Sequence, residues 1–188
     1  MRAAGFVLAG GRSMRMGQDK ARLKVGAYCL VELVANVVRE AAGNVALVGN
    51  PAVFADLPLD CLADLQPGLG PLAGLEAVLA SGRGELNLVV GCDMPGLSGV
   101  DLRCLLESAQ KNRALCTVAV DMSGRRHPLC AVYRSEALPT VRSALAAGRL
   151  RLLDMVEELK AVDVRIDAVL SNLNTPEQWA AWQADRLV

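Results

Sequence analysis

The chain has 188 residues, of which 53% are hydrophobic and 3% aromatic, and its 20 basic residues are matched by 20 acidic ones. This length suits one domain with a sizeable core, and the balanced charge argues against a nucleic-acid coat or a membrane-surface protein. No apolar stretch reaches the ~18 residues of a membrane span. We therefore expect a single domain, residues 1–188, that is cytoplasmic and binds a small molecule rather than nucleic acid or a membrane.

Short apolar runs alternate with amphipathic segments along the chain, which is typical of an α/β domain. Residues 5–9 form the first apolar run, and the helix expected at 30–41 has apolar residues every three or four positions and stops at Gly43. The run at 86–93 is the most strand-like in the sequence and ends before Pro95. The other predicted elements are strands at 45–48, 59–63, 115–121, 128–133 and 161–166, and helices at 72–81, 100–110, two between 136 and 160, and one after Pro176.

This order of elements predicts one doubly wound, mostly parallel sheet with helices on both faces, a Rossmann-like fold whose core is built from Val, Leu and Ala. The six cysteines include no CxxC pair and no histidine spacing for a zinc site, so we interpret them as reduced, small core residues. They lie at positions 29, 61, 92, 104, 116 and 130. The first residues lead into a charged glycine loop instead of a cleavage site, and no signal peptide is predicted.

The segment LAGGRSMRMGQDK, residues 8–20, follows the first predicted strand. In an open α/β sheet, ligands bind beyond the carboxyl ends of the strands, and Gly10 and Gly11 would let successive amides form a nest for anions. Three basic side chains add positive charge: Arg12, Arg15 and Lys20. The loop matches neither a P-loop nor a G-x-G-x-x-G fingerprint, so it would hold phosphates in another way. The alternative is a surface loop with scattered charge.

Asp93 lies at the carboxyl end of the strand predicted at 86–93, where its side chain should point into the cleft. Magnesium prefers carboxylate and phosphate oxygens and needs only one or two protein ligands. Asp93 is therefore a candidate metal ligand, the alternative being a helix or turn cap.

Asp64 opens a Pro/Gly-rich loop before the third predicted helix and would either contact a nucleotide or support the loop. Gly68, Gly70 and Gly74 would let the backbone pass close to a flat base. Alternatively, Gly70 and Pro71 simply form the turn that starts a helix. The single histidine, His127, is interpreted as a structural or acceptor-side residue rather than a proton carrier.

Several motifs together resemble the molybdenum cofactor guanylyltransferases, within the broader nucleotidyltransferases. They are L-A-G-G-x-S-x-R-M-G-x-D-K at 8–20, D-x-x-P-G-x-G-P-L-A-G at 64–74, C-D-M-P at 92–95, R-H-P-L at 126–129 and N-x-N-T-P-E-Q-W at 172–179. The double glycine and the P-L-A-G segment narrow the resemblance to the guanylyl branch. The sequence departs from the family at Cys29, at Ser171 and at Val48, where relatives place a polar nucleotide contact that Asn50 would have to supply.

The resemblance implies that the phosphate of molybdopterin attacks the α-phosphorus of GTP, forming the guanine dinucleotide cofactor and pyrophosphate with the help of Mg²⁺. A phosphate nucleophile is already ionised at neutral pH, so alignment and charge neutralisation are sufficient. The implied catalytic residues are Lys20, Arg15 and Asp93, and Asp93 is the metal ligand. The implied nucleotide contacts are Leu8, Ala9, Gly10, Gly11, Lys20, Asp64, Gly70, Pro71 and Asp93.

Two alternatives stay open at this point. The first is a related nucleotidyltransferase with another base or acceptor, such as a molybdopterin cytidylyltransferase or a sugar-phosphate nucleotidyltransferase. The second is a nucleotide-binding module without catalysis, against which the presence of both Lys20 and Asp93 argues. Contacts with other cofactor-biosynthesis proteins or with recipient molybdoenzymes are also left open by the sequence.

Overall fold

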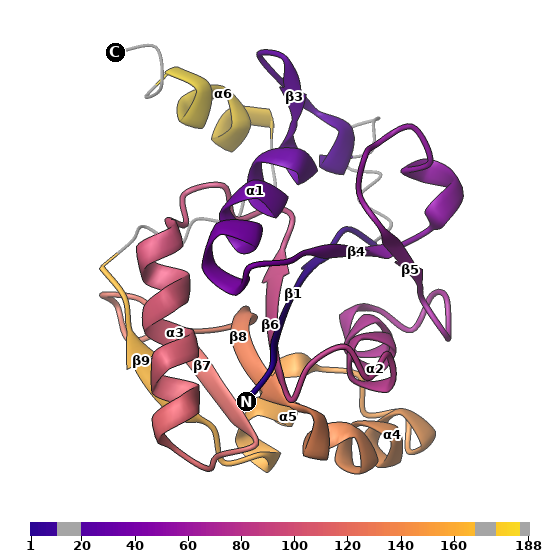
Figure 1. The fold of residues 1–188 in the computed structure, drawn as a ribbon, viewed down its shortest axis with the longest axis vertical. Coiled ribbons are helices and arrows are strands. Elements are labelled where there is room, and N and C mark those ends of the chain that lie inside the picture. The colour runs from indigo at the N-terminus through magenta and orange to yellow at the C-terminus, as the bar shows by residue number, and fades with distance from the viewer. Residues whose placement is uncertain (11–19, 168–175, 185–188) are drawn as a thin grey trace.

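The computed structural model describes residues 1–10, 20–167 and 176–184, and its centre is one seven-stranded sheet of order β5-β4-β1-β6-β8-β7-β9 (Figure 1). In this sheet, as far as the described residues go, β8 alone runs antiparallel to its neighbours, β6 and β7. The strands are β1 (Ala3–Leu8), β4 (Ala46–Gly49), β5 (Cys61–Ala63), β6 (Leu86–Gly91), β7 (Cys116–Val120), β8 (Arg126–Arg134) and β9 (Val162–Arg165).

Helices cover both faces of the sheet, as Figure 1 shows. On one face α1 (Leu30–Ala42) and α3 (Gly99–Lys111) pack against the strands, and on the other face lie α2 (Pro71–Ala80), α4 (Leu138–Ala146) and α5 (Leu152–Glu158). The last helix of the described chain is α6 (Pro176–Ala184). The predicted fold class, a doubly wound and mostly parallel sheet, is confirmed.

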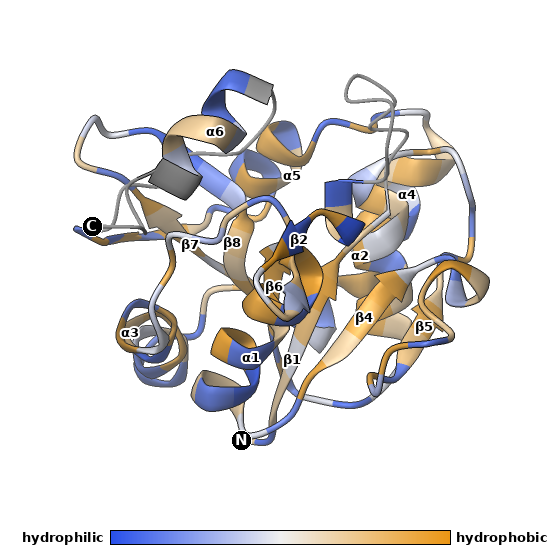
Figure 2. Ribbon diagram, turned by 90° about the horizontal axis from the view of Figure 1, so that it is seen from above, coloured by the Kyte–Doolittle hydropathy of each residue, from blue (hydrophilic) through white to orange (hydrophobic). Residues whose placement is uncertain are grey.

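The buried strands and one-sided helices follow from their residue patterns. All six residues of β6 are buried, whereas α1 buries only its apolar stripe, including Val31, Val34 and Val38. In Figure 2 the central strands are largely orange, while α1 and α3 carry both orange and blue segments. Gly43 ends α1 in the left-handed region, at φ +77°, and its N–H donates to the Arg39 carbonyl at 2.8 Å.

The predicted helices and long strands are all present within a few residues of their expected bounds. A two-stranded hairpin, β2 (Lys24–Val25) with β3 (Tyr28–Cys29), was not predicted, because two-residue strands are too short to show a periodic pattern. The strand expected at 86–93 ends at Gly91, since the chain turns there and the Met94 N–H donates to the Gly91 carbonyl. No helix in the described part of the chain is long and apolar enough to cross a membrane.

The cysteines do not all lie in the core, so that prediction is wrong in part. Cys29, Cys116 and Cys130 are buried, but Cys104 is exposed on the outer side of α3. It is exposed because its neighbours Leu102, Leu105 and Leu106 occupy the face of α3 that packs on the sheet.

Candidate active site

The sheet brings the ends of its central strands together at one edge. β1 pairs in parallel with β4 and with β6, so that Leu8 lies between Val48 and Gly91. The Cys92 N–H donates to the Leu8 carbonyl at 3.1 Å and extends this pairing by one residue. The segments that follow β1 and β6 therefore start side by side, as expected for a ligand site at the carboxyl ends of the strands.

Lys20 and Asp93 meet at this edge although 73 positions separate them. Lys20 begins a short 3-10 helix (Lys20–Arg22) and is only 5% exposed, and its Nζ lies 3.1 Å from Oδ2 of Asp93. A buried ammonium group is costly unless a carboxylate offsets its lost hydration. The pair places one positive and one negative group, both largely shielded from water, at the carboxyl ends of the central strands.

Asp93 does not serve as the helix cap that the sequence left open. Ser98 caps α3: its Oγ accepts a hydrogen bond from the Asp101 N–H, and the Asp101 carboxylate accepts one from the Ser98 N–H. The Asp93 carboxylate instead folds back over Gly91, where an added Cβ would lie 2.7 Å from Oδ1. The side chain at position 91 must be absent for Asp93 to hold this orientation.

The start of the glycine loop lies against the neighbouring strand. Leu8 is buried, the Ala9 N–H donates to the Val48 carbonyl at 2.9 Å, and a Cβ on Gly10 would lie 3.7 Å from the Cα of Gly49. The predicted contacts Gly11 and Arg15 lie outside the described residues, as does Arg12.

The loop from Asp64 to Pro71 is held by its own hydrogen bonds. The Asp64 carboxylate accepts from the Gln66 N–H at 3.0 Å, and the Gln66 carbonyl accepts from the Leu69 N–H at 3.3 Å. Gly68 has φ +96°, so residues 66–69 form a turn with Pro at its second position and Gly at its third, which is the type II pattern. Asp64 thus supports the loop, one of the two roles open from the sequence.

Gly70 and Pro71 lie where α2 begins. Gly70 is the N-cap residue with φ +78°, and Pro71 occupies the first helical turn, so the helix-starting interpretation is confirmed for both. The interpretation of Gly74 as a base-facing glycine is wrong. It lies buried inside α2, and a Cβ there would be 3.2 Å from Cδ2 of Leu8, because the helix packs closely on the end of β1.

Val48 stands where relatives have a polar contact to the nucleotide, and Asn50 was the candidate to replace that contact. Val48 is buried in the sheet core, and the Asn50 side chain accepts a hydrogen bond from the Ala52 N–H at 3.1 Å, capping a 3-10 helix (Pro51–Val53).

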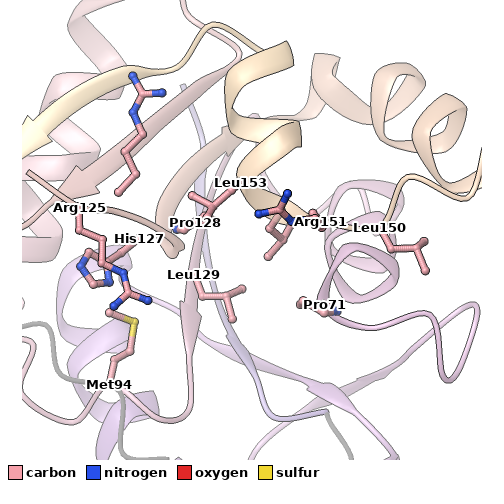
Figure 3. A pocket seen from close by; sticks show the side chains of 11 residues that line it. Pro71, Met94, Arg125, His127, Pro128, Leu129, Leu150, Arg151 and Leu153 are labelled. Atoms are coloured by element: carbon pink, nitrogen blue, oxygen red, sulfur yellow. The ribbon is translucent and has the colours of Figure 1, made fainter.

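A basic pocket of about 310 Å³ lies beside this edge. Figure 3 shows Arg125, His127 and Met94 on one side of the pocket and Arg151 and Pro71 on the other. Met94 directly follows Asp93, and Pro71 begins α2, so the pocket adjoins the loops already described. Of the residues lining this pocket, the sequence had singled out His127 and Pro71 as candidate site residues but not Arg125 or Arg151, although the basic clusters at 125–126 and 149–151 were a signal for both.

Asp121 organises the turn that carries the basic residues. Its carboxylate lies 2.8 Å from Nε2 of His127 and accepts hydrogen bonds from the Ser123 hydroxyl, the Ser123 N–H and the Arg125 N–H. The Ser123 hydroxyl first, and then His127, hold the pKa of Asp121 well below its usual range. His127 is buried, which fits its predicted structural or acceptor-side role.

The arginines of the pocket differ in their partners. Arg126 is paired with Asp163 on β9 through two nitrogen–oxygen contacts, of 2.8 and 3.1 Å. Arg151 has only a longer contact, 3.4 Å, with Asp154. In the described part of the chain no carboxylate pairs with the Arg125 side chain. Of the three arginines that line the pocket, Arg125 and Arg151 are therefore better placed than Arg126 to bind an anionic ligand.

The fold is similar to the folds of several solved structures. The chain is similar to the molybdopterin-guanine dinucleotide biosynthesis protein A of Archaeoglobus fulgidus, with a TM-score of 0.81, 22% identity and 98% of each chain covered. It is also similar to a Mycobacterium tuberculosis H37Rv protein solved in complex with manganese, with a TM-score of 0.73, 17% identity and 98% and 99% of the two chains covered. At these identities the likeness concerns the fold alone.

The fold and the site define a nucleotidyltransferase. More particularly, the chain belongs to the MobA-like NTP transferase domain family, whose model matches residues 5–164. It is 38% identical over 184 residues to the molybdenum cofactor guanylyltransferase of Xanthomonas euvesicatoria pv. vesicatoria, with 94% of this chain and 92% of the relative covered. The resemblance drawn from the sequence motifs is confirmed.

Proposed function

We propose that this chain transfers GMP from GTP to molybdopterin. An oxygen of the acceptor phosphate bonds to the α-phosphorus of GTP, the bond from that phosphorus to the bridging oxygen breaks, and pyrophosphate leaves. The observation that carries the proposal is the contact between Lys20 and Asp93, 3.1 Å long, where the glycine loop and the end of β6 meet. Curated relatives of full length, named as guanylyltransferases, support the choice of substrates.

The residues divide into a phosphate side and a base side. The ammonium group of Lys20, with Arg15, would neutralise charge that develops on the triphosphate, and backbone groups from Leu8 to Gly11 would approach it closely. Asp64, Gly70 and Pro71 belong to the loop that would face the base. No general base is required, because the attacking phosphate is already ionised at neutral pH.

The site suits a magnesium ion held mostly by the substrate. Among residues 1–10, 20–167 and 176–184, no group of three or more His, Cys, Asp or Glu side chains is arranged to hold a metal ion. Magnesium typically takes one or two carboxylates and fills its remaining positions with water and phosphate oxygens. Asp93, whose Oδ1 occupies the space over Gly91, would hold it. Bound there, Mg²⁺ would neutralise charge on the phosphates of GTP.

The basic pocket would receive the acceptor. Arg125 and Arg151 would bind its phosphate, since arginine offers several donors in a fork that matches phosphate oxygens. Met94 and Pro71 line the same pocket, so an acceptor phosphate there would lie near the residue that follows Asp93 and near the start of α2.

We also propose that residues 1–188 act as one domain, which the seven-stranded sheet and the family match over residues 5–164 support. We further propose that the protein acts in the cytoplasm. Contacts with other cofactor-biosynthesis proteins and with recipient molybdoenzymes stay a prediction from the family resemblance.

Titration calorimetry with GTP, CTP, UTP and ATP in the presence of magnesium tests the base assignment. We expect GTP to bind at least about tenfold more tightly than the other three, a difference of ~1.4 kcal/mol. CTP binding as tightly as GTP would favour a cytidylyltransferase, and the proposal would then be wrong.

A further inference from the structure

Glu76 is the single charged residue of α2, and it is buried. The other residues of the helix are apolar, and Glu76 is 6% exposed. A buried carboxylate lowers stability unless both of its oxygens find donors or a positive charge. An apolar residue at this position would avoid the cost of removing a charge from water, so the carboxylate calls for an explanation beyond packing.

Each carboxylate oxygen of Glu76 has a donor from a different element. The Gln66 side-chain Nε2 donates to Oε2 at 2.8 Å, and the Arg142 Nε of α4 donates to Oε1 at 3.0 Å. Arg142 is half exposed and supplies the balancing charge. The carboxylate thus joins the loop before α2, α2 itself and α4.

Gln66 lies at the centre of the loop that this contact holds. Its N–H donates to Asp64, its carbonyl accepts from Leu69, and its side chain reaches Glu76. Gln66 itself is exposed, so packing does not fix its position. The hydrogen bond to Glu76 anchors the exposed start of the turn at 66–69 to the core, and Leu69 packs against the core at the other end of the turn.

We propose that Glu76 is a positioning residue that, through Gln66, sets the shape of the loop at 64–70 and with it the affinity and base selectivity for the nucleotide. The inference rests on the proposed function, which assigns this loop to the base. The bond acts at a distance from the phosphates, so it affects KM for the nucleotide more than kcat.

Two single variants and one reciprocal double variant test the proposal. Gln66→Ala removes the contact at an exposed position, and Gln66→Glu places a second carboxylate against the first, where like charges repel. In the double variant Glu76→Gln with Gln66→Glu, the amide at 76 donates to the carboxylate at 66, and its oxygen still accepts from Arg142. Gln110→Ala, at an exposed glutamine of α3, is the matched control.

We expect KM for GTP to rise about fivefold in Gln66→Ala and about tenfold in Gln66→Glu, with kcat within about twofold of wild type. The preference for GTP over CTP should be smaller in both single variants than in the wild type. In the double variant, KM for GTP and this preference should lie within about twofold of the wild-type values. The control should match wild type.

Two results would overturn the inference while leaving the proposed function intact. One is wild-type KM and base preference in Gln66→Glu. The other is a rise in KM that the double variant fails to reverse, which is what a purely structural role for Glu76 predicts. A wild-type protein that does not bind GTP would instead contradict the proposed function, and the inference would fall with it.

Discussion

Leu8 and Gly91 are register partners between β1 and β6, and each is the last residue of its strand. The two strands run parallel, so their carboxyl ends lie side by side. The pairing of Leu8 with Gly91 therefore fixes where the glycine loop leaves β1 and where the segment with Asp93 leaves β6. Lys20 then returns to the same edge and pairs with Asp93. The candidate site is thus built on two buried central strands, and its loops start from fixed points.

Replacing Lys20 by alanine tests its role toward the triphosphate. We expect turnover at saturating GTP to fall by ~10²-fold or more, the usual cost of losing one electrostatic contact to developing charge. Lys24→Ala, at an exposed lysine of β2, should leave turnover near the wild-type value. Pyrophosphate release measures both, and full turnover in Lys20→Ala would refute the assignment.

Asp93→Asn tests the metal site. The amide keeps the shape of the side chain but removes a negative charge, which weakens the attraction for a hard divalent cation. We expect activity to collapse and to return in part at high magnesium or with manganese. GTP binding without metal should change little. A magnesium dependence identical to that of wild type would argue that Asp93 has a purely structural role.

Gly74→Val tests the packing of α2 on the sheet. A Cβ at position 74 would lie 3.2 Å from Leu8, so the branched side chain overpacks the contact and should lower the free energy of unfolding by about 1–3 kcal/mol. Ala80→Val, at an exposed position of the same helix, should change it by less than about 0.5 kcal/mol. Urea unfolding measures both, and equal stabilities would show that α2 has room at Gly74.

Asp121→Asn tests the turn before β8. The pKa of Asp121 is lowered in the folded state, so its carboxylate stabilises the protein above its unfolded pKa, about 4, and this contribution is lost as the pH falls further. The wild type should therefore be more stable than the variant at pH 6–7, and the gap should narrow below about pH 4. Urea midpoints across this range give the comparison. A gap that is the same at every pH would exclude the carboxylate as its source.

The thiols should differ in reactivity according to burial. Burial raises the pKa of Cys116 to about 12 and also raises that of Cys130, so both stay neutral and shielded at pH 8. Cys104 is exposed on α3 and should be alkylated first by iodoacetamide. Mass spectrometry of the partly labelled protein shows the order, and early labelling of Cys116 or Cys130 would indicate that the core opens readily.

Regular elements could be predicted from the sequence because their signals are local. The apolar stripe of α1, its glycine stop and the buried run of β6 each lie within one stretch of chain, as does the position of Asp93 after a strand. The hairpin of β2 and β3 escaped prediction because its two-residue strands show no period.

Other features depend on contacts between distant residues. Gly74 faces Leu8 and not a ligand because α2 packs closely on β1, and the glycine pattern alone cannot distinguish the two reasons for a missing side chain. Arg125 and Arg151 form one pocket only because β8 and the start of α5 lie together at this edge. The bond between Gln66 and Glu76 likewise joins a loop to the single charged residue of an otherwise apolar helix, and the sequence alone does not pair the two.

The central claim is that this chain makes a guanine dinucleotide from molybdopterin, and product formation tests it most directly. Purified protein is incubated with molybdopterin and magnesium, together with either GTP or CTP, and the products are identified by mass spectrometry. We predict the guanine dinucleotide with one pyrophosphate released per product, and little or no cytosine dinucleotide. Formation of the cytosine product at an equal or greater rate, or no dinucleotide with either nucleotide, would contradict the account.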